Sequence, residues 1–274
     1  METIVIESTG DNLPVYTLAV LAFALALESF IPRRDLAGGM LSRWTNNFSL
    51  SLLSWYISMV LSTAFILWLA TWVKWEQIGL FNQFEAPAPV IFLVLLLFSQ
   101  FLGYWVHVAF HHVSWLWPLH AVHHSDIDVD VSTSYRHHPL EPLISMPIVT
   151  PLILLLGVSP EVAVAFKFYE VAATVFSHSN IRIPEPLEKW LRYIILTPDF
   201  HRLHHASDPQ YTNSNYGSLV PWYDYLFGTA SNRPYAEQED MELGLEYERE
   251  AADNRLDKLL VQPVRVYRDT DGHV

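Results

Sequence analysis

The chain has no cysteine. Disulfide bonds, thiolate-ligated haem, cysteine-ligated iron–sulfur clusters and thiol catalysis are therefore excluded. Charged residues make up only 16% of the 274 residues, against about 25% in an average soluble domain. The net charge of −13 comes largely from acids between residues 237 and 257, and no basic patch is visible that would suit nucleic acid. We therefore expect no nucleic-acid partner.

Two further features are missing. No positively charged segment precedes the first apolar run, and no signal-peptide cleavage pattern follows it, so a cleaved secretory leader is not predicted. Internal repeats and low-complexity segments are also lacking. The chain must therefore be interpreted from its hydrophobic runs and its histidines.

Hydrophobic residues make up 51% of the chain. About 20 apolar residues cross the hydrocarbon core of a bilayer, and the runs at 13–31, 48–73 and 90–106 approach or exceed this length. Two shorter runs, 143–158 and 161–176, are separated by Gly157, Ser159 and Pro160, which predicts a helical hairpin in the membrane. We expect an all-α fold, a polytopic membrane helix bundle with a cytosolic, histidine-rich helical cap.

The loop after the first run carries Arg33, Arg34 and Arg43, which places it in the cytoplasm by the positive-inside rule. Glu28, just before it, is interpreted as an interfacial carboxylate near Arg33. When the following hydrophobic runs cross the membrane in alternating directions from this loop, all histidine clusters lie on the cytoplasmic side. Residues 183–197 resemble an amphipathic helix in the headgroup region. We divide the chain into N-terminal transmembrane helices (1–103), a catalytic region with the hairpin (104–229) and an acidic soluble tail (230–274).

Thirteen histidines are present, and most lie in short clusters. Residues three or four apart share one face of a helix, so each cluster can direct several imidazoles toward one point. Neutral imidazole binds iron, zinc, copper and nickel, and a single ion needs only three or four protein ligands. The surplus favours a site with two metal ions. The clusters are His107 with His111, His120 with His123 and His124, and His201 with His204 and His205.

The same stretch matches a known pattern through the motifs YWVHVAFH, LWPLHAVHHSD, STSYRHHPLE, FSHSNIRIP, TPDFHRLHH, TNSNYG and DYLFGT. In these motifs the chain resembles the fatty acid hydroxylase/sterol desaturase family of integral-membrane di-iron oxygenases. The resemblance covers residues 104–229. It adds His138 and His178 to the clustered histidines as metal ligands. Whether His112 or His137 contributes stays open, and His273 in the C-terminal tail is expected to lie outside the ligand set. Val108 and Asn213 stand where the family often has Arg and Asp.

The resemblance implies a site with two iron ions, which zinc can replace in purified protein, and O₂ as co-substrate. Catalysis would rest on the di-iron centre itself, with no separate acid or base assigned. Electrons would come from a separate donor, a ferredoxin or a b5-type protein with its reductase, because the chain shows no cytochrome-like domain. The implied reaction is hydroxylation of a lipid C–H bond. The lipid class, the oxidised carbon, the donor and the oligomeric state stay open.

Three alternatives remain. A desaturase would use the same site, and would remove two hydrogens where a hydroxylase adds one oxygen. A membrane zinc hydrolase would need a general base beside the metal, as in HExxH, and no histidine here is followed by glutamate. A metal transporter or non-catalytic metal-binding protein would place ligands near the bilayer midplane, whereas these histidines fall at the ends of the apolar runs.

Overall fold

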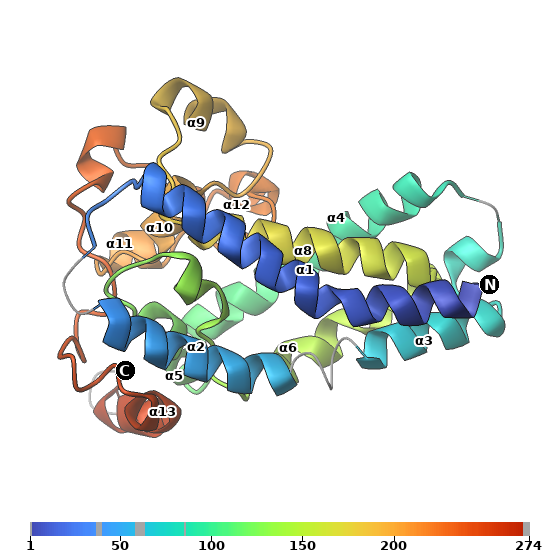
Figure 1. The fold of residues 1–274 in the computed structure, drawn as a ribbon, viewed down its shortest axis with the longest axis horizontal. Helices are drawn as coiled ribbons and strands as arrows, with labels where there is room; N and C mark the ends of the chain where they lie inside the picture. Colours follow the sequence, from blue (N-terminus) through green and yellow to red (C-terminus); the bar gives the residue numbers. More distant parts are fainter. Residues whose placement is uncertain (1, 37–39, 58–63, 85, 271–274) are drawn as a thin grey trace.

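The structure is a computed structural model that describes residues 2–36, 40–57, 64–84 and 86–270. These residues form helices joined by loops, and the β-type pairing among them consists of two isolated bridges, Pro32–Ile181 and Ala206–Leu243. Long helices extend toward one end of the molecule, and short helices gather at the other (Figure 1). The all-α class predicted from the sequence is confirmed.

A hydrophobic core joins the long helices. It is built from four helices, and Ala70, Val73 and Val158 are fully enclosed in it. The four are α3 (Ala64–Trp75), α4 (Ala88–His112), α7 (Pro151–Leu156) and α8 (Pro160–His178). The longest helix, α1 (Glu2–Phe30), packs beside this core against α8, and its Ala24 is buried with Val175 of α8.

Two helical stretches of the described chain, Asn12–Phe30 and Ala88–His112, are long and apolar enough to cross a membrane. The predicted run at 48–73 falls on α2 (Met40–Ile57) and α3, and residues 58–63 between them lie outside the described residues. The expected hairpin consists of α6 (Glu141–Val149) and α7, a shorter apolar stretch, followed by α8. The described chain thus contains two candidate spans, and the full multi-pass topology stays a prediction.

The turn between α7 and α8 fits closely against the loop after α3, which contains η2 (Leu80–Asn82). Gly157 ends α7 with a φ of 69°, and Gly79 has a φ of 91°, a backbone region that strongly favours glycine. A Cβ atom on Gly79 would lie 2.3 Å from the backbone nitrogen of Gly157. Both glycines are therefore required for this contact between the hairpin and the loop.

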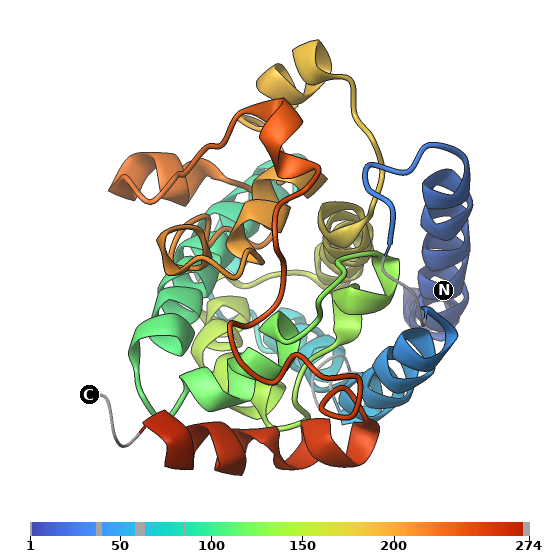
Figure 2. The same ribbon diagram turned by 90° about the vertical axis from the view of Figure 1, so that its left-hand side faces the viewer.

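Residues after 230, expected as an acidic soluble tail, pack onto the short-helix end (Figure 2). Met241 and Leu243 are buried against Leu203, and Leu259 is buried with Leu50 and Val122. The last helix therefore covers the segment that carries the second histidine cluster. The elements at this end are α5 (Trp117–His124), η3 (Val131–Tyr135), α9 (Glu185–Leu191), α10 (Pro198–His204), α11 (Pro209–Thr212), α12 (Trp222–Phe227), η4 (Tyr235–Gln238) and α13 (Leu256–Thr270).

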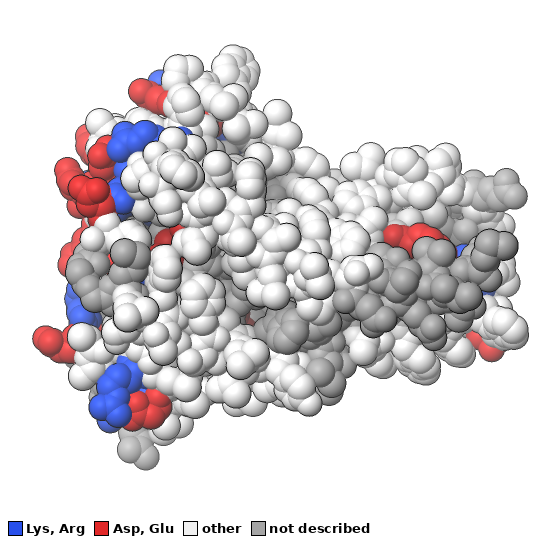
Figure 3. All heavy atoms as spheres, in the orientation of Figure 1, with Lys and Arg blue, Asp and Glu red and all other residues white. Residues whose placement is uncertain are grey.

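Charged side chains are unevenly distributed over the face seen in Figure 3. Lys, Arg, Asp and Glu gather at the end that carries the short helices, whereas the long-helix half is mostly uncharged. Around α9, the amphipathic segment expected at 183–197, Leu187, Trp190 and Ile194 are exposed. This pattern is typical of a protein whose charged end lies outside a bilayer.

Candidate metal centre

The histidine clusters lie on helices whose ends meet. The last turns of α4 carry His107 and His111, and α8 ends at His178. The second cluster lies on α5, and the third on α10 with His205 as its C-cap. Thr197 caps the start of α10, where its hydroxyl accepts a hydrogen bond from the N–H of Phe200. The helical spacing expected for the clusters is confirmed.

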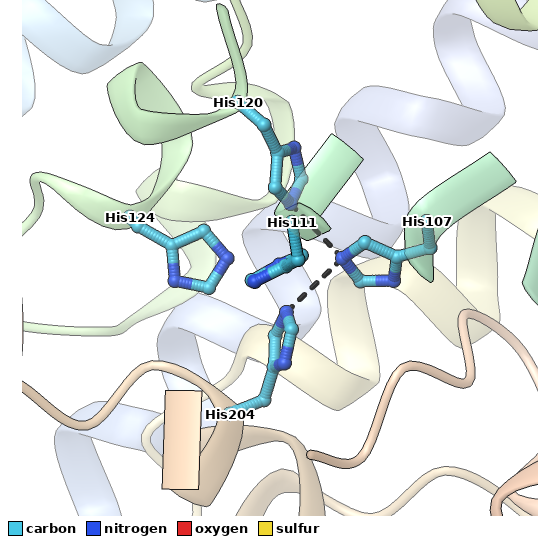
Figure 4. A group of neighbouring side chains, drawn as sticks. All are labelled: His107, His111, His120, His124 and His204. Carbon is cyan, nitrogen blue, oxygen red and sulfur yellow. Dashed lines mark hydrogen bonds between the residues drawn. The ribbon is translucent and has the colours of Figure 1, made fainter. Parts of the chain in front are cut away.

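Five imidazoles converge on one point and form what we call the first histidine group (Figure 4). One nitrogen from each ring lies within 4.8 Å of the corresponding nitrogen of every other ring. In Figure 4 the rings enter from several sides and face a common centre. The members are His107, His111, His120, His124 and His204.

Four further imidazoles form the second histidine group, and all four residues are buried. It contains His178, which the resemblance alone had selected. Its ligand atoms also lie within 4.8 Å of one another. The members are His123, His178, His201 and His205.

Each HxxHH motif contributes to both groups. The neighbours His123 and His124 enter different groups, with their rings at 89°, and the rings of His204 and His205 stand at 87°. Residues four apart, by contrast, stay in one group because they share a helix face. The groups consequently adjoin, and the ring centroids of His124 and His205 are 4.6 Å apart.

Backbone carbonyls fix the orientation of four of these rings. In each case the imidazole Nδ1–H donates to a carbonyl oxygen, so Nε2 is left with a lone pair directed into the group. The pairs are His107 with Tyr216 at 2.6 Å, His204 with Ser214 at 2.7 Å, His178 with Thr174 at 2.8 Å and His123 with Arg136 at 3.2 Å.

The directed lone pairs face one another. Nε2 of His107 lies 2.9 Å from Nε2 of His120 and 3.0 Å from Nε2 of His204, and all three rings have their Nδ1 atoms engaged elsewhere. In the second group, Nε2 of His178 lies 3.2 Å from Nε2 of His123. Two neutral nitrogens without protons repel each other at these distances, whereas a cation between them removes the repulsion. The all-imidazole donor set fits iron or zinc.

Burial keeps the imidazoles neutral, which is the form that binds metals. Burial lowers the pKa of His178 to about 4 and that of His204 to about 3. Burial, reinforced by repulsion from neighbouring imidazoles, also holds the pKa of His124, His201 and His205 well below the ordinary value. At neutral pH these five rings are thus ready to act as ligands.

The structure brings nine of the ten predicted ligands into the two groups and places His138 apart from them. Nε2 of His138 donates to the carbonyl oxygen of Leu260 at 3.3 Å, and its Nδ1 accepts from the N–H of Leu140 at 3.2 Å. Its neighbour His137, assigned no role from the sequence, stacks on His123 with ring centroids 4.2 Å apart. The inward-facing histidine of this pair is therefore His137.

Two histidines that were not predicted as ligands, His112 and His273, remain to be placed. Nε2 of His112 pairs with the hydroxyl of Tyr216 at 2.9 Å, outside both groups. His273 lies outside the described residues.

Glu141 was missed by the sequence analysis, although it belongs to the quoted HPLE motif. Its Oε1 accepts hydrogen bonds from Nδ1 of His120 at 3.1 Å and Nδ1 of His137 at 3.0 Å. Burial opposes its ionisation, but His137 and His120 outweigh burial and hold the pKa of this carboxyl well below its usual range. Glu141 is consequently an anion that orients a first-group ring, and the three residues form a further cluster that can hold a metal.

A buried polar framework holds the second cluster in place and was also missed. The guanidinium of Arg136 donates to the carbonyl oxygen of Val122 at 3.0 Å and to Oγ of Ser125 at 2.6 Å. Asp126 accepts from Arg43 at 2.9 Å. The sequence signal for this framework was the charged residue within two positions of the histidines in HHSD and in YRHH.

Arginines of the first loop reach the centre as well. Arg33 is fully buried and pairs with Asp199 of α10 at 3.1 Å. Arg202 donates to the carbonyl oxygen of Ser179 at 3.0 Å. The arginines that were used to predict orientation therefore also join the N-terminal helices to the histidine segments.

Two cavities reach the histidines. The larger, about 350 Å³, runs between α1, α6 and α8 and is lined at one end by His137 and Glu141; we call it the long cavity. The second, about 230 Å³, is lined by His111, Trp117 and Asn213. Asn213, a departure from the family pattern, is thus placed beside a first-group imidazole.

Comparison with known proteins gives consistent matches. The chain is 30% identical over 178 residues to an alkylglycerol monooxygenase from Homo sapiens, covering 62% of this chain and 36% of that protein. It is 32% identical over 139 residues to the very-long-chain aldehyde decarbonylase GL1-5 from Oryza sativa subsp. indica, covering 47% of this chain and 22% of that protein. The chain thus spans well under half the length of these relatives. No solved structure matches it.

The fatty acid hydroxylase family model matches residues 92–229, which contain both histidine groups, Glu141 and Arg136. The match covers half of the chain and agrees with the resemblance found in the motifs. The chain belongs to the fatty acid hydroxylase family.

Proposed function

We propose that this protein is a membrane-bound di-iron oxygenase that uses O₂ and external electrons to hydroxylate a C–H bond of a lipid. The observation that carries the proposal is the pair of adjoining imidazole groups, whose lone pairs face one another at 2.9–3.2 Å. The first histidine group would hold one iron ion and the second histidine group the other. Zinc can occupy the same ligands in purified protein.

Bound iron would supply the activation of O₂, one oxygen atom entering the C–H bond and the other leaving as water, with two electrons and two protons from outside the chain. The residues of the chain supply orientation. Backbone carbonyls of Tyr216 and Ser214 hold two first-group rings, and the Glu141 carboxylate holds a third. A separate electron donor, a ferredoxin or a b5-type protein, is part of the proposal.

The long cavity is the proposed lipid site. Its wall is mostly apolar, and it extends from His137 to Leu13 and Ile66 on α1 and α3. A lipid could enter it from the bilayer with its reacting carbon toward the histidines. We propose that α1 and α4 cross the membrane, that further helices complete a multi-pass bundle, and that the charged end with the histidine groups faces the cytoplasm.

The relatives suggest two lipid classes. One relative is named for its action on alkylglycerols, and the other is named for very-long-chain aldehydes. An ether lipid is our first candidate substrate because the human monooxygenase aligns with the larger share of this chain, 62%. A long-chain aldehyde is the second, and a desaturation outcome at the same site remains the closest alternative reaction.

The test combines metal analysis with turnover. Purified protein should contain iron, consume O₂ only when a reductant is supplied, and convert an added lipid to a product heavier by one oxygen in mass spectrometry. Loss of two hydrogens would identify a desaturase. Activity under strict anaerobiosis would refute an oxygenase and favour a zinc hydrolase, and metal flux into proteoliposomes without O₂ consumption would favour a transporter.

A further inference from the structure

The long cavity has polar groups in a wall that a plain hydrocarbon chain would not need. Three hydroxyls that line it are buried and have no hydrogen-bond partner among the residues that the structure describes. They are the side-chain hydroxyls of Ser134, Tyr135 and Thr150. A buried polar group without a partner is costly, and such groups are rare in native proteins. Their clustering in one cavity indicates that an occupant provides the missing partners.

An ion pair lies in the same wall. Nζ of Lys167 is 2.6 Å from Oε2 of Glu170, and the two side chains are 19% and 39% exposed. Both residues line the cavity. Because the pair is neutral overall, it attracts no net charge, but it offers donors and an acceptor to an uncharged oxygen.

The distance to the metal centre follows from the helix. Glu170 precedes the second-group ligand His178 by eight residues on α8, which corresponds to about 12 Å along the helix axis.

Burial, reinforced by the nearby Glu170 carboxylate, raises the pKa of the Tyr135 phenol. Its O–H therefore remains a donor across the physiological pH range.

We propose that the lipid bound in the long cavity carries an uncharged oxygen, a hydroxyl or its equivalent, remote from the oxidised carbon, and that Tyr135, Lys167 and Glu170 bind it. This inference rests on the proposed function, since the long cavity must be the lipid site. The substrate is then a lipid whose polar oxygen lies well away from the carbon that is oxidised. A fatty acyl or alkyl chain that ends in a methyl group leaves the three residues without their partner.

The test measures binding, without turnover. The full-length protein in lipid nanodiscs is titrated with a long-chain alkane and with alcohols of equal length whose single hydroxyl is moved along the chain. We expect one alcohol to bind about tenfold more tightly than the matching alkane, the ratio expected for one added hydrogen bond. Tyr135→Phe should remove most of that ratio. Tyr193→Phe, an exposed tyrosine outside the cavity, is the matched control and should leave it unchanged.

A second variant tests the charge balance. Glu170→Gln leaves Lys167 without its anion, so the preference should move from the alcohol to a carboxylic acid of the same length. An ion pair that the ligand does not contact would not produce this shift.

Equal affinity of the wild-type protein for every alcohol and for the alkane would overturn the proposal, as would an unchanged ratio in Tyr135→Phe. The two proposals fail separately. A preference for an alcohol without O₂-dependent product would leave the polar subsite standing and refute the oxygenase, whereas turnover of a plain alkyl lipid with no alcohol preference would do the reverse.

Discussion

Replacing Glu141 should weaken metal binding at one of the two positions and spare the other. The carboxylate accepts hydrogen bonds from His120 and His137 at 3.1 and 3.0 Å and contacts the first group through His120. Removing a group that orients a metal ligand typically lowers metal affinity 10–100-fold, which is about 1.4–2.7 kcal/mol. Glu141→Gln keeps one acceptor oxygen and loses the charge, so we expect about tenfold; Glu141→Ala loses both and should approach 100-fold.

The assay is a competition titration of iron-loaded protein with a chelator, in which the two ions are released in separate steps. In Glu141→Ala one release step should move and the other stay, because the second histidine group receives its orienting bonds from Arg136 and Thr174. Glu161→Gln changes an exposed carboxylate paired with Lys74 and is the matched control. Equal loss of both ions, or an unchanged titration, would refute the role given to Glu141.

Further outcomes are expected elsewhere. His204→Ala should lower the amount of bound iron, measured by metal analysis, and abolish turnover, measured by O₂ uptake. His112→Ala, at a residue outside both groups, should change neither quantity. Acidification should destabilise the metal-free protein because the pKa of His178 is about 4 in the folded state and about 6.5 in the unfolded chain. Between these two values the unfolded chain binds a proton that the folded protein does not bind. Thermal unfolding at pH 5 should therefore show a loss of about 2 kcal/mol in the free energy of unfolding from this residue. Arg136→Met should cost about 3–5 kcal/mol, measured in the same way, because buried Asp126 loses one of its cationic neighbours.

The grouping of residues four apart could be predicted because helix geometry is local. His120 with His124 and His201 with His205 share a helix face whatever the rest of the chain does, and the structure puts each pair in one group. The division of adjacent histidines between two groups follows from the same geometry, since neighbours on a helix diverge. Spacing thus predicted most of the candidate site, and the motifs added His178.

The choice between His137 and His138 could not be predicted in this way. Both follow η3 in a loop, where no helical period applies. Arg136 is held by Val122 and Ser125, and the adjacent His137 then faces His123 and Glu141. His138 faces Leu260 on α13, which is 122 residues away in the sequence. Its direction depends on tertiary contacts that the motif does not contain.

Glu28, just before the first loop, was misinterpreted for a similar reason. Glu28 was expected as an interfacial carboxylate near Arg33. It is buried, and its Oε1 accepts hydrogen bonds from the backbone N–H groups of Val131 and Asn180 at 3.0 and 2.5 Å. Arg33 pairs instead with Asp199. A charge at the end of an apolar run has the same sequence signature whether it faces headgroups or a distant partner.

These contacts bear on how the chain is divided. Glu28, Arg33 and Arg43 belong to the segment assigned to N-terminal membrane helices, yet their partners lie beside His124, His178 and His201. Buried ions are stable only when their partners are held at the correct distance, so the position of α1 and α2 and the geometry of the histidine groups are mutually dependent. These contacts therefore join the N-terminal helices to the histidine segments across residue 103.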